Sequence, residues 1–143
     1  MRVRSVLEAK GRQVVTVRPD DTLTTALVLL AENRVGAVVV TTTHHEVVGI
    51  MSERDIVSAL ARHGVRCLSE NVSTHMSTQV RSCTEDSTCD ELALLMTTER
   101  FRHVPVMNGS ELVGIISIGD VVKVRLNELE KDRHDLLEYV NAR

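Results

Sequence analysis

The sequence predicts a mixed α/β protein made of two tandem βαββα repeats and a C-terminal helix. The stretch at residues 49–55 recurs 65 residues later, and the segment at 10–40 matches 76–106 at an offset of 66. Each copy also alternates strand and helix patterns of apolar residues. Because about sixty residues bury little surface alone, the halves should pack as one pseudo-twofold unit. We place repeat 1 at residues 1–63, repeat 2 at 70–125 and a helical extension at 126–143.

Short apolar runs alternate with helical patterns along repeat 1. Thr22 is the expected N-cap of the first helix, because its hydroxyl can accept a hydrogen bond from a free N–H of the first turn. Gly64 stands where the C-cap of the second helix is expected. The predicted elements are a strand at 14–17, a helix at 22–33, strands at 37–41 and 47–51 around a hairpin at 44–46, and a helix at 52–62.

Repeat 2 is expected to contain the same elements. Thr88 and Glu91 have the spacing of a capping box at the start of its first helix. Residues 67–73, between the repeats, are predicted to form a polar linker.

The C-terminal tail carries a heptad pattern of apolar residues among charged ones. The apolar positions follow a 4-3-7-4 spacing, with Arg133 in the one missing slot. We expect a helix that extends past the repeat and packs on a partner; the alternative is a helix that lies back on its own domain. The apolar positions are Val122, Leu126, Leu129, Leu136 and Val140.

The composition excludes several classes of protein. The hydrophobic fraction is 43%, with one Phe, one Tyr and no Trp, so the core must be aliphatic and base stacking on aromatic side chains is not expected. A net charge of −3 argues against a nucleic-acid-binding surface. No apolar run approaches a membrane span and no signal peptide opens the chain, so we expect a cytoplasmic protein.

The three cysteines do not form a metal-binding or disulfide pattern. Cys67, Cys83 and Cys89 are an odd number without CxxC spacing. Cys89 aligns with Leu23 of repeat 1, which predicts a small core residue. The six histidines lack the i, i+4 spacing of metal ligands on a helix, so we expect no metal site.

Each repeat carries Gly-x-x-Ser-x-x-Asp where its last strand meets its last helix. Ser52 and Asp55 form the first copy, and Ser117 and Asp120 the second. N–H groups at a helix N-terminus attract anions, so the motif could cradle a ligand. The simpler interpretation is a capping box that stabilises the helix start. Recurrence at the same place in both halves favours the ligand site.

Two adjacent basic residues add to this pattern in repeat 2 only. Arg102 and His103 stand at the entrance of a buried strand, where they suit a phosphate better than a packed core. The alternative is a solvated turn. Their counterparts in repeat 1, Gly36 and Ala37, carry no charge.

The paired motifs and the Val-Pro-Val strand at 104–106 make the sequence resemble a cystathionine-β-synthase (CBS) domain pair, or Bateman module, over residues 3–125. The resemblance implies two repeats packed by their sheets, with two clefts between them. It also implies ligands that contain adenosine: AMP, ADP, ATP, S-adenosylmethionine or NAD(H). Such pairs commonly associate again, so a homodimer is implied.

The resemblance also assigns roles to residues of both clefts. In one cleft, Asp120 would accept the ribose hydroxyls, Ser117 would meet the phosphate, and Arg102 and His103 would neutralise it; Ile115 would line the adenine slot. The same cleft would take Asp21, Val35 and Gly36 from repeat 1. The mirror cleft would use Asp55, Ser52, Arg54, Ile50, Ser87, Phe101 and Arg102.

The clefts should be unequal, because the residues of repeat 1 that match Arg102 and His103 are the uncharged Gly36 and Ala37. We expect the cleft with Asp120 to hold phosphate better. The small residues Gly36 and Ala37 also leave room for a larger or dinucleotide ligand. Residues 10–12 could add phosphate contacts or form an exposed basic turn.

We therefore expect a regulatory sensor that binds an adenine nucleotide and signals through its oligomer or a regulated protein. An enzyme is not expected, because no His or Cys is visibly paired with an orienting carboxylate. One alternative is a structural protein that acts through the C-terminal helix. A metal-binding stress protein is a further alternative.

Overall fold

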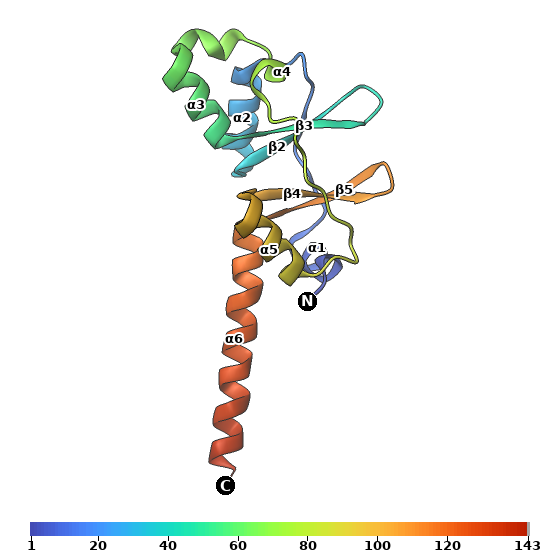
Figure 1. The fold of residues 1–143 in the computed structure, drawn as a ribbon, viewed down its shortest axis with the longest axis vertical. Coiled ribbons are helices and arrows are strands. Elements are labelled where there is room, and N and C mark those ends of the chain that lie inside the picture. Colours follow the sequence, from blue (N-terminus) through green and yellow to red (C-terminus); the bar gives the residue numbers. More distant parts are fainter. Residues whose placement is uncertain (143) are drawn as a thin grey trace.

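The computed structural model describes residues 1–142 and shows two repeats, one above the other, with one long helix projecting from the second (Figure 1). It confirms the expected mixed α/β class with a final helix. The elements are α1 (Val3–Lys10), β1 (Thr16–Val17), α2 (Leu23–Asn33), β2 (Ala37–Thr41), β3 (Val47–Ser52), α3 (Glu53–His63), the 3₁₀ turn η1 (Val65–Ser69), α4 (Val72–His75), α5 (Cys89–Glu99), β4 (His103–Asn108), β5 (Glu111–Ser117) and α6 (Ile118–Asn141).

Each repeat is built on a small sheet. In repeat 1, β2 pairs with β1 in parallel and with β3 antiparallel. In repeat 2, β4 and β5 form an antiparallel pair, and the expected leading strand is reduced to one parallel bridge between Cys83 and Val106. That expected strand was wrong, because Val80 is the only β-branched apolar residue among its polar neighbours, whereas residues 14–17 are a β-branched run.

The interior consists of two aliphatic clusters, one per repeat. Strand β2 is buried along its whole length, as its apolar sequence predicted. Helices α2 and α3 cover the first cluster, and α5 and the start of α6 cover the second. Cys89 is 5% exposed within the second cluster, which confirms its role as a small core residue.

The helix that begins each repeat packs on the other repeat. Helix α1, which the sequence did not predict, buries Val3, Val6 and Leu7 in the cluster of repeat 2. Reciprocally, Val72 of α4 and the following Met76 pack in the cluster of repeat 1. The two repeats are therefore held together by an exchange of their leading helices.

A glycine in each hairpin admits these exchanged segments. A Cβ at Gly114 would lie 2.7 Å from a methyl carbon of Leu7, and a Cβ at Gly49 would lie 2.6 Å from the sulfur of Met76. The Gly-x-x-Ser-x-x-Asp motif thus begins with a residue whose lack of a side chain is required for packing.

The segment between the repeats, which was predicted to be a polar linker, is folded and partly buried. It forms η1 and α4, and it buries Cys67 and Val72 completely. The carboxylate of Glu70 lies 2.9 Å from Nε2 of His75, and Thr24 donates a hydrogen bond to the carbonyl of Leu68. The linker prediction was wrong because two buried apolar side chains suffice to anchor a short segment within a polar sequence.

Helix α6 begins on repeat 2 and continues far beyond it (Figure 1). Val121 and Val124 are its buried residues, and every described side chain after Glu128 is exposed. The alternative of a tail that lies back on its own domain is therefore wrong. Within residues 1–142 no helix, α6 included, is long and apolar enough to cross a membrane.

We predict that Leu7→Ala destabilises the protein by about 2–4 kcal/mol, because Leu7 is fully buried and a cavity would open beneath α1. The measurement is urea denaturation followed by circular dichroism. Leu94→Ala is the control, since Leu94 is 69% exposed and should change stability by about 0.5 kcal/mol or less. Equal effects of the two substitutions would show that α1 does not contribute to the core of repeat 2.

Candidate functional site

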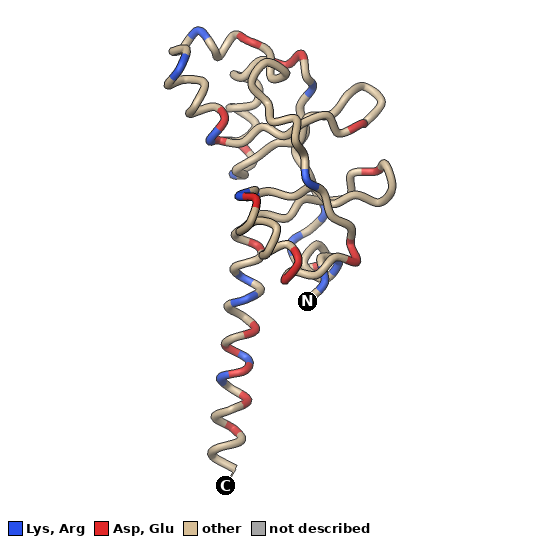
Figure 2. The backbone as a smooth tube through the Cα atoms, viewed as in Figure 1, with Lys and Arg blue, Asp and Glu red and all other residues tan. Residues whose placement is uncertain are grey.

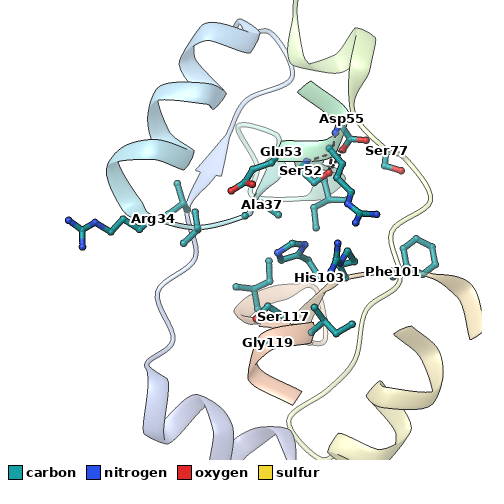
Figure 3. Close-up of a pocket in the computed structure, with 18 of the residues that line it drawn as sticks. Arg34, Ala37, Ser52, Glu53, Asp55, Ser77, Phe101, His103, Ser117 and Gly119 are labelled. Atoms are coloured by element: carbon teal, nitrogen blue, oxygen red, sulfur yellow. Dashed lines mark hydrogen bonds between the residues drawn. The ribbon is translucent and has the colours of Figure 1, made fainter. Parts of the chain in front are cut away.

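A cavity of about 700 Å³ lies between the repeats, where the β3–α3 and β5–α6 junctions face each other (Figure 3). Residues expected for two separate clefts line this one cavity. Ser52, Glu53 and Asp55 enter from repeat 1, and His103, Ser117 and Gly119 from repeat 2.

The N-terminus of α3 is closed by a reciprocal capping box. Ser52 Oγ accepts a hydrogen bond from the backbone N–H of Asp55 at 3.3 Å. In return, Oδ2 of Asp55 accepts from the backbone N–H of Ser52 at 2.9 Å and from its hydroxyl at 3.0 Å. The capping interpretation of the motif is correct for this copy.

The N-terminus of α6 repeats the arrangement and adds a cation. Oδ2 of Asp120 accepts from the backbone N–H of Ser117 at 2.8 Å and from Nζ of Lys10 at 2.6 Å. Lys10 also donates to the carbonyl of Ile115 at 2.8 Å. Burial by itself would raise the pKa of Asp120, but the hydrogen bonds from Lys10 and Ser117 hold it below its ordinary value of 3.8.

Capping leaves one backbone donor free at each helix start. The first N–H groups, of Glu53 and Ile118, donate to the carbonyls of Gly36 and Arg102. The third N–H groups, of Asp55 and Asp120, donate to the Oγ atoms of Ser52 and Ser117. Within the part of the chain that the structure describes, the second N–H groups, of Arg54 and Gly119, meet no acceptor. Both residues line the cavity, and a free N–H at a helix N-terminus favours an anion.

His103 fills the space that Gly36 leaves open. A Cβ at Gly36 would lie 3.1 Å from Nε2 of His103, so residues from the corresponding strand entrances of the two repeats meet across the pseudo-twofold axis. The free volume expected beside Gly36 is therefore occupied. Burial, and secondarily the charge of Arg102, lowers the pKa of His103 below 6.5, so the imidazole is neutral at pH 7.

The lining of the cavity combines positive charge with aliphatic side chains. Five basic and two acidic side chains line it, although the whole chain has a net charge of −3. The basic residues are Lys10, Arg34, Arg54, Arg100 and Arg102, and the acidic ones are Glu53 and Asp55. The aliphatic ones are Val15, Val35, Ala37, Ile50, Ile115 and Ile118.

Eleven of the fourteen predicted site residues line this cavity. They are Ile50, Ser52, Arg54, Asp55, Val35, Gly36, Phe101, Arg102, His103, Ile115 and Ser117. Asp120 is not among the lining residues, but it is bonded to two of them, Lys10 and Ser117.

Asp21 and Ser87 are not brought to the cavity. Asp21 accepts a hydrogen bond from the backbone N–H of Arg18, and its own carbonyl accepts from Val72. Ser87 accepts from the backbone N–H of Thr84. Both residues close the turn before a helix, which is the ordinary use of Asp and Ser at such positions.

Sequence reasoning missed or undervalued three basic residues of the lining. Lys10 reaches Asp120 only because α1 crosses to repeat 2. Arg34 and Arg100 end α2 and α5 with φ of 54° and 61°, a left-handed conformation that favours glycine. Two aligned arginines where glycine is favoured were a detectable signal. Arg34 lies at the rim with its side chain directed outward (Figure 3).

The cysteines and histidines are candidate metal ligands and reactive groups. Among residues 1–142, no group of three His, Cys, Asp or Glu side chains is placed to hold a metal ion. Burial, together with the neighbouring Cys89, raises the pKa of Cys83 to about 12, which makes its thiol unreactive.

Comparison with known proteins gives a consistent family. The sequence matches the CBS domain twice, over residues 4–62 and 70–127. A CBS-domain-containing protein of Agrobacterium tumefaciens is 48% identical, with a TM-score of 0.84 over 87% of this chain and 92% of that chain. The CBS domain-containing protein YhcV of Bacillus subtilis is 31% identical over 117 residues, 82% of each chain.

A more distant structure contains ligands. It is a CBS domain pair in complex with 5-methylthioadenosine and S-adenosyl-L-methionine, 22% identical, with a TM-score of 0.80 over 90% of this chain and 98% of that chain. At this identity the likeness concerns the fold alone. With both repeats matched and the fold shared, this chain belongs to the CBS domain family, as a tandem pair of CBS domains.

Proposed function

We propose that the cavity binds a phosphate-bearing adenosine nucleotide, namely AMP, ADP, ATP or NAD(H), and that the protein is a regulatory sensor of it. The observation that carries this proposal is the pair of helix N-termini, each with a free N–H, that open on one basic cavity, with the carboxylate of Asp55 in its lining and that of Asp120 bonded to the lining residues Lys10 and Ser117. The ligand state would be passed to a second copy or to a regulated protein.

The carboxylates of Asp120 and Asp55 suit a ribose. A carboxylate can accept hydrogen bonds from both hydroxyls of a vicinal diol. Each Asp uses Oδ2 for its own capping box, and no hydrogen bond from the described residues reaches Oδ1. Lys10 adds a second donor to Asp120, so a ribose on this side would share or displace the Lys10 contact.

The phosphate would bind at the same helix starts. The backbone N–H of Gly119 is free, and Arg102 stands beside it in the cavity wall. An anion at this point gains from the aligned peptide dipoles and from a guanidinium that can donate two parallel hydrogen bonds. Ile115 and Ile50, one from each repeat, offer the apolar surface that a purine face needs.

The charge of the cavity favours nucleotides over S-adenosylmethionine. A relative of the same fold binds that sulfonium compound and 5-methylthioadenosine, neither of which has a phosphate. Here five cations against two carboxylates disfavour a cationic ligand and favour a polyanion. The Oγ atoms of Ser52 and Ser117 are used as helix caps. This use favours a binding site over an enzyme in which a serine is the nucleophile.

We predict that Asp120→Asn weakens nucleotide binding at least tenfold, because the ribose loses a charged acceptor. The ligand is first found by thermal shift with AMP, ADP, ATP, NAD, NADH and S-adenosylmethionine. A ligand at 100 times its Kd adds about 2.7 kcal/mol of stability. The substitution also removes the ion pair between Asp120 and Lys10, which changes the stability of the protein and therefore its thermal shift. For this reason the affinity of the variant is measured by calorimetry.

Asp135→Asn makes the same change of charge on the exposed part of α6 and is the matched control. It should leave affinity unchanged. No thermal shift with any phosphate-bearing ligand, or a shift with S-adenosylmethionine alone, would refute the proposal.

We also predict that His103 takes up a proton when the nucleotide binds. The pKa of His103 is below 6.5 in the folded protein, so the ligand-free protein loses stability as pH falls below 6.5, where the unfolded chain is protonated first. A phosphate beside the ring would raise this pKa, so binding should strengthen between pH 8 and pH 6.

Calorimetry in buffers of different ionisation enthalpy measures the proton uptake. A terminal phosphate itself titrates near pH 6, so the difference between the parent and His103→Gln isolates the imidazole. Identical proton uptake in the two proteins would place the phosphate away from His103.

A further inference from the structure

Lys10, the last residue of α1, lines the cavity and is held there by two acceptors of repeat 2. Its Nζ donates to Oδ2 of Asp120 at 2.6 Å and to the carbonyl of Ile115 at 2.8 Å. The chain is basic where it leaves α1, with Arg12 following two residues later (Figure 2). Arg12 bonds instead to the carboxylate of Glu85, so the cation that this segment brings to the cavity is the ammonium of Lys10.

The matching junction of repeat 1 has no such cation. There the carbonyl of Ile50 accepts a hydrogen bond from a backbone donor, the N–H of Ser77, at 2.9 Å. The residue that aligns with Lys10 is Met76, whose side chain packs in the core of repeat 1. Within residues 1–142, the hydrogen bonds to the carboxylate of Asp55 come from its own capping box. A lysine therefore occupies the carboxylate of one junction and not that of the other.

The ion pair occupies an acceptor that a ribose needs. Oδ2 of Asp120 accepts from the backbone N–H of Ser117 at 2.8 Å and from Nζ of Lys10. A carboxylate oxygen has two lone-pair positions, so Oδ2 has none left for a hydroxyl. A vicinal diol that bonds both carboxylate oxygens must therefore remove Lys10 from Oδ2.

A phosphate would give the displaced ammonium a new partner. The carbonyl of Ile115 can keep one N–H of the ammonium while the other two turn to the cavity. Arg102 and Gly119, which would hold the phosphate, line the same cavity. Burial, the charge of Arg102 and, less strongly, the charge of Lys10 lower the pKa of His103, so the ammonium lies within electrostatic reach of this imidazole.

We propose that Lys10 is a movable cation that selects phosphorylated ligands: the ribose displaces it from Asp120, and the ammonium then pairs with the phosphate. The side chains of Lys10 and Asp120 are only 32% and 21% exposed, so an ammonium left there without a counter-ion is unfavourable. A nucleotide replaces the broken ion pair, whereas adenosine does not. The inference rests on the proposed function and adds to it a discrimination against nucleosides.

The affinities of the full chain for adenosine and AMP, measured by calorimetry, test this role, because the two compounds differ only in the phosphate. In Lys10→Met, adenosine should bind at least tenfold more tightly, since no ion pair has to break. AMP should change less than threefold, since in the parent protein the new pair replaces the old one. Met keeps an unbranched stem at this position, so the packing of α1 is retained.

Arg4→Met is the matched control. It removes the same charge from α1 and breaks the ion pair of Arg4 with Asp86, but Arg4 does not line the cavity. Both affinities should stay as in the parent protein. If Lys10 only fastens the end of α1 to repeat 2, or only attracts phosphate, Lys10→Met gives adenosine no gain beyond that of Arg4→Met, and the inference is overturned.

A second test introduces Lys10→Met into Asp120→Asn protein. With no ion pair to break, the substitution should no longer strengthen adenosine binding, and an equal gain in both backgrounds would overturn the inference. AMP binding by the parent protein without a gain for adenosine in Lys10→Met would overturn this inference alone. No thermal shift with any phosphate-bearing compound would overturn the proposed function, and the inference with it.

Discussion

The structure depends on the exchange of leading helices between the two repeats. Leu7 of α1 lies on Gly114 of repeat 2, and Met76, directly after α4, lies on Gly49 of repeat 1. Neither repeat has its full apolar cluster without the segment from the other. The exchange fixes how the two strand–helix junctions face each other, and therefore creates the cavity between them.

The same exchange determines the chemistry of the cavity. Lys10 comes to Asp120 on the end of α1, and Ser77 comes to Ile50 on the segment that follows α4, where the two residues exchange backbone hydrogen bonds. Each helix start then divides its N–H groups, since the first and third are used by the fold and the second has no acceptor among the described residues. Capping and the proposed binding would thus use different groups of the same turn, which the spacing Ser-x-x-Asp alone could not distinguish.

Repetition made much of this fold predictable. The 65-residue recurrence predicted the junctions at Ser52 and Ser117, because local hydrogen bonding dictates how such a turn closes. The exchange was not predictable, since three apolar residues at 3–7 do not indicate which core they join. Asp21 and Ser87 were assigned to the site from the family resemblance, although their side chains are used in turns. Whether His103 would fill the space beside Gly36 depended on packing across the axis, which neither repeat encodes alone.

Helix α6 connects the cavity to the exposed C-terminal part of the chain. Ile118 and Gly119 line the cavity, and the same unbroken helix carries the exposed apolar residues from Val122 onward. A ligand that shifts the helix start would tilt the exposed part, because a continuous hydrogen-bonded helix moves as one body. Any such coupling is reciprocal: if a nucleotide changes the affinity of α6 for a partner by some factor, that partner must change nucleotide affinity by the same factor.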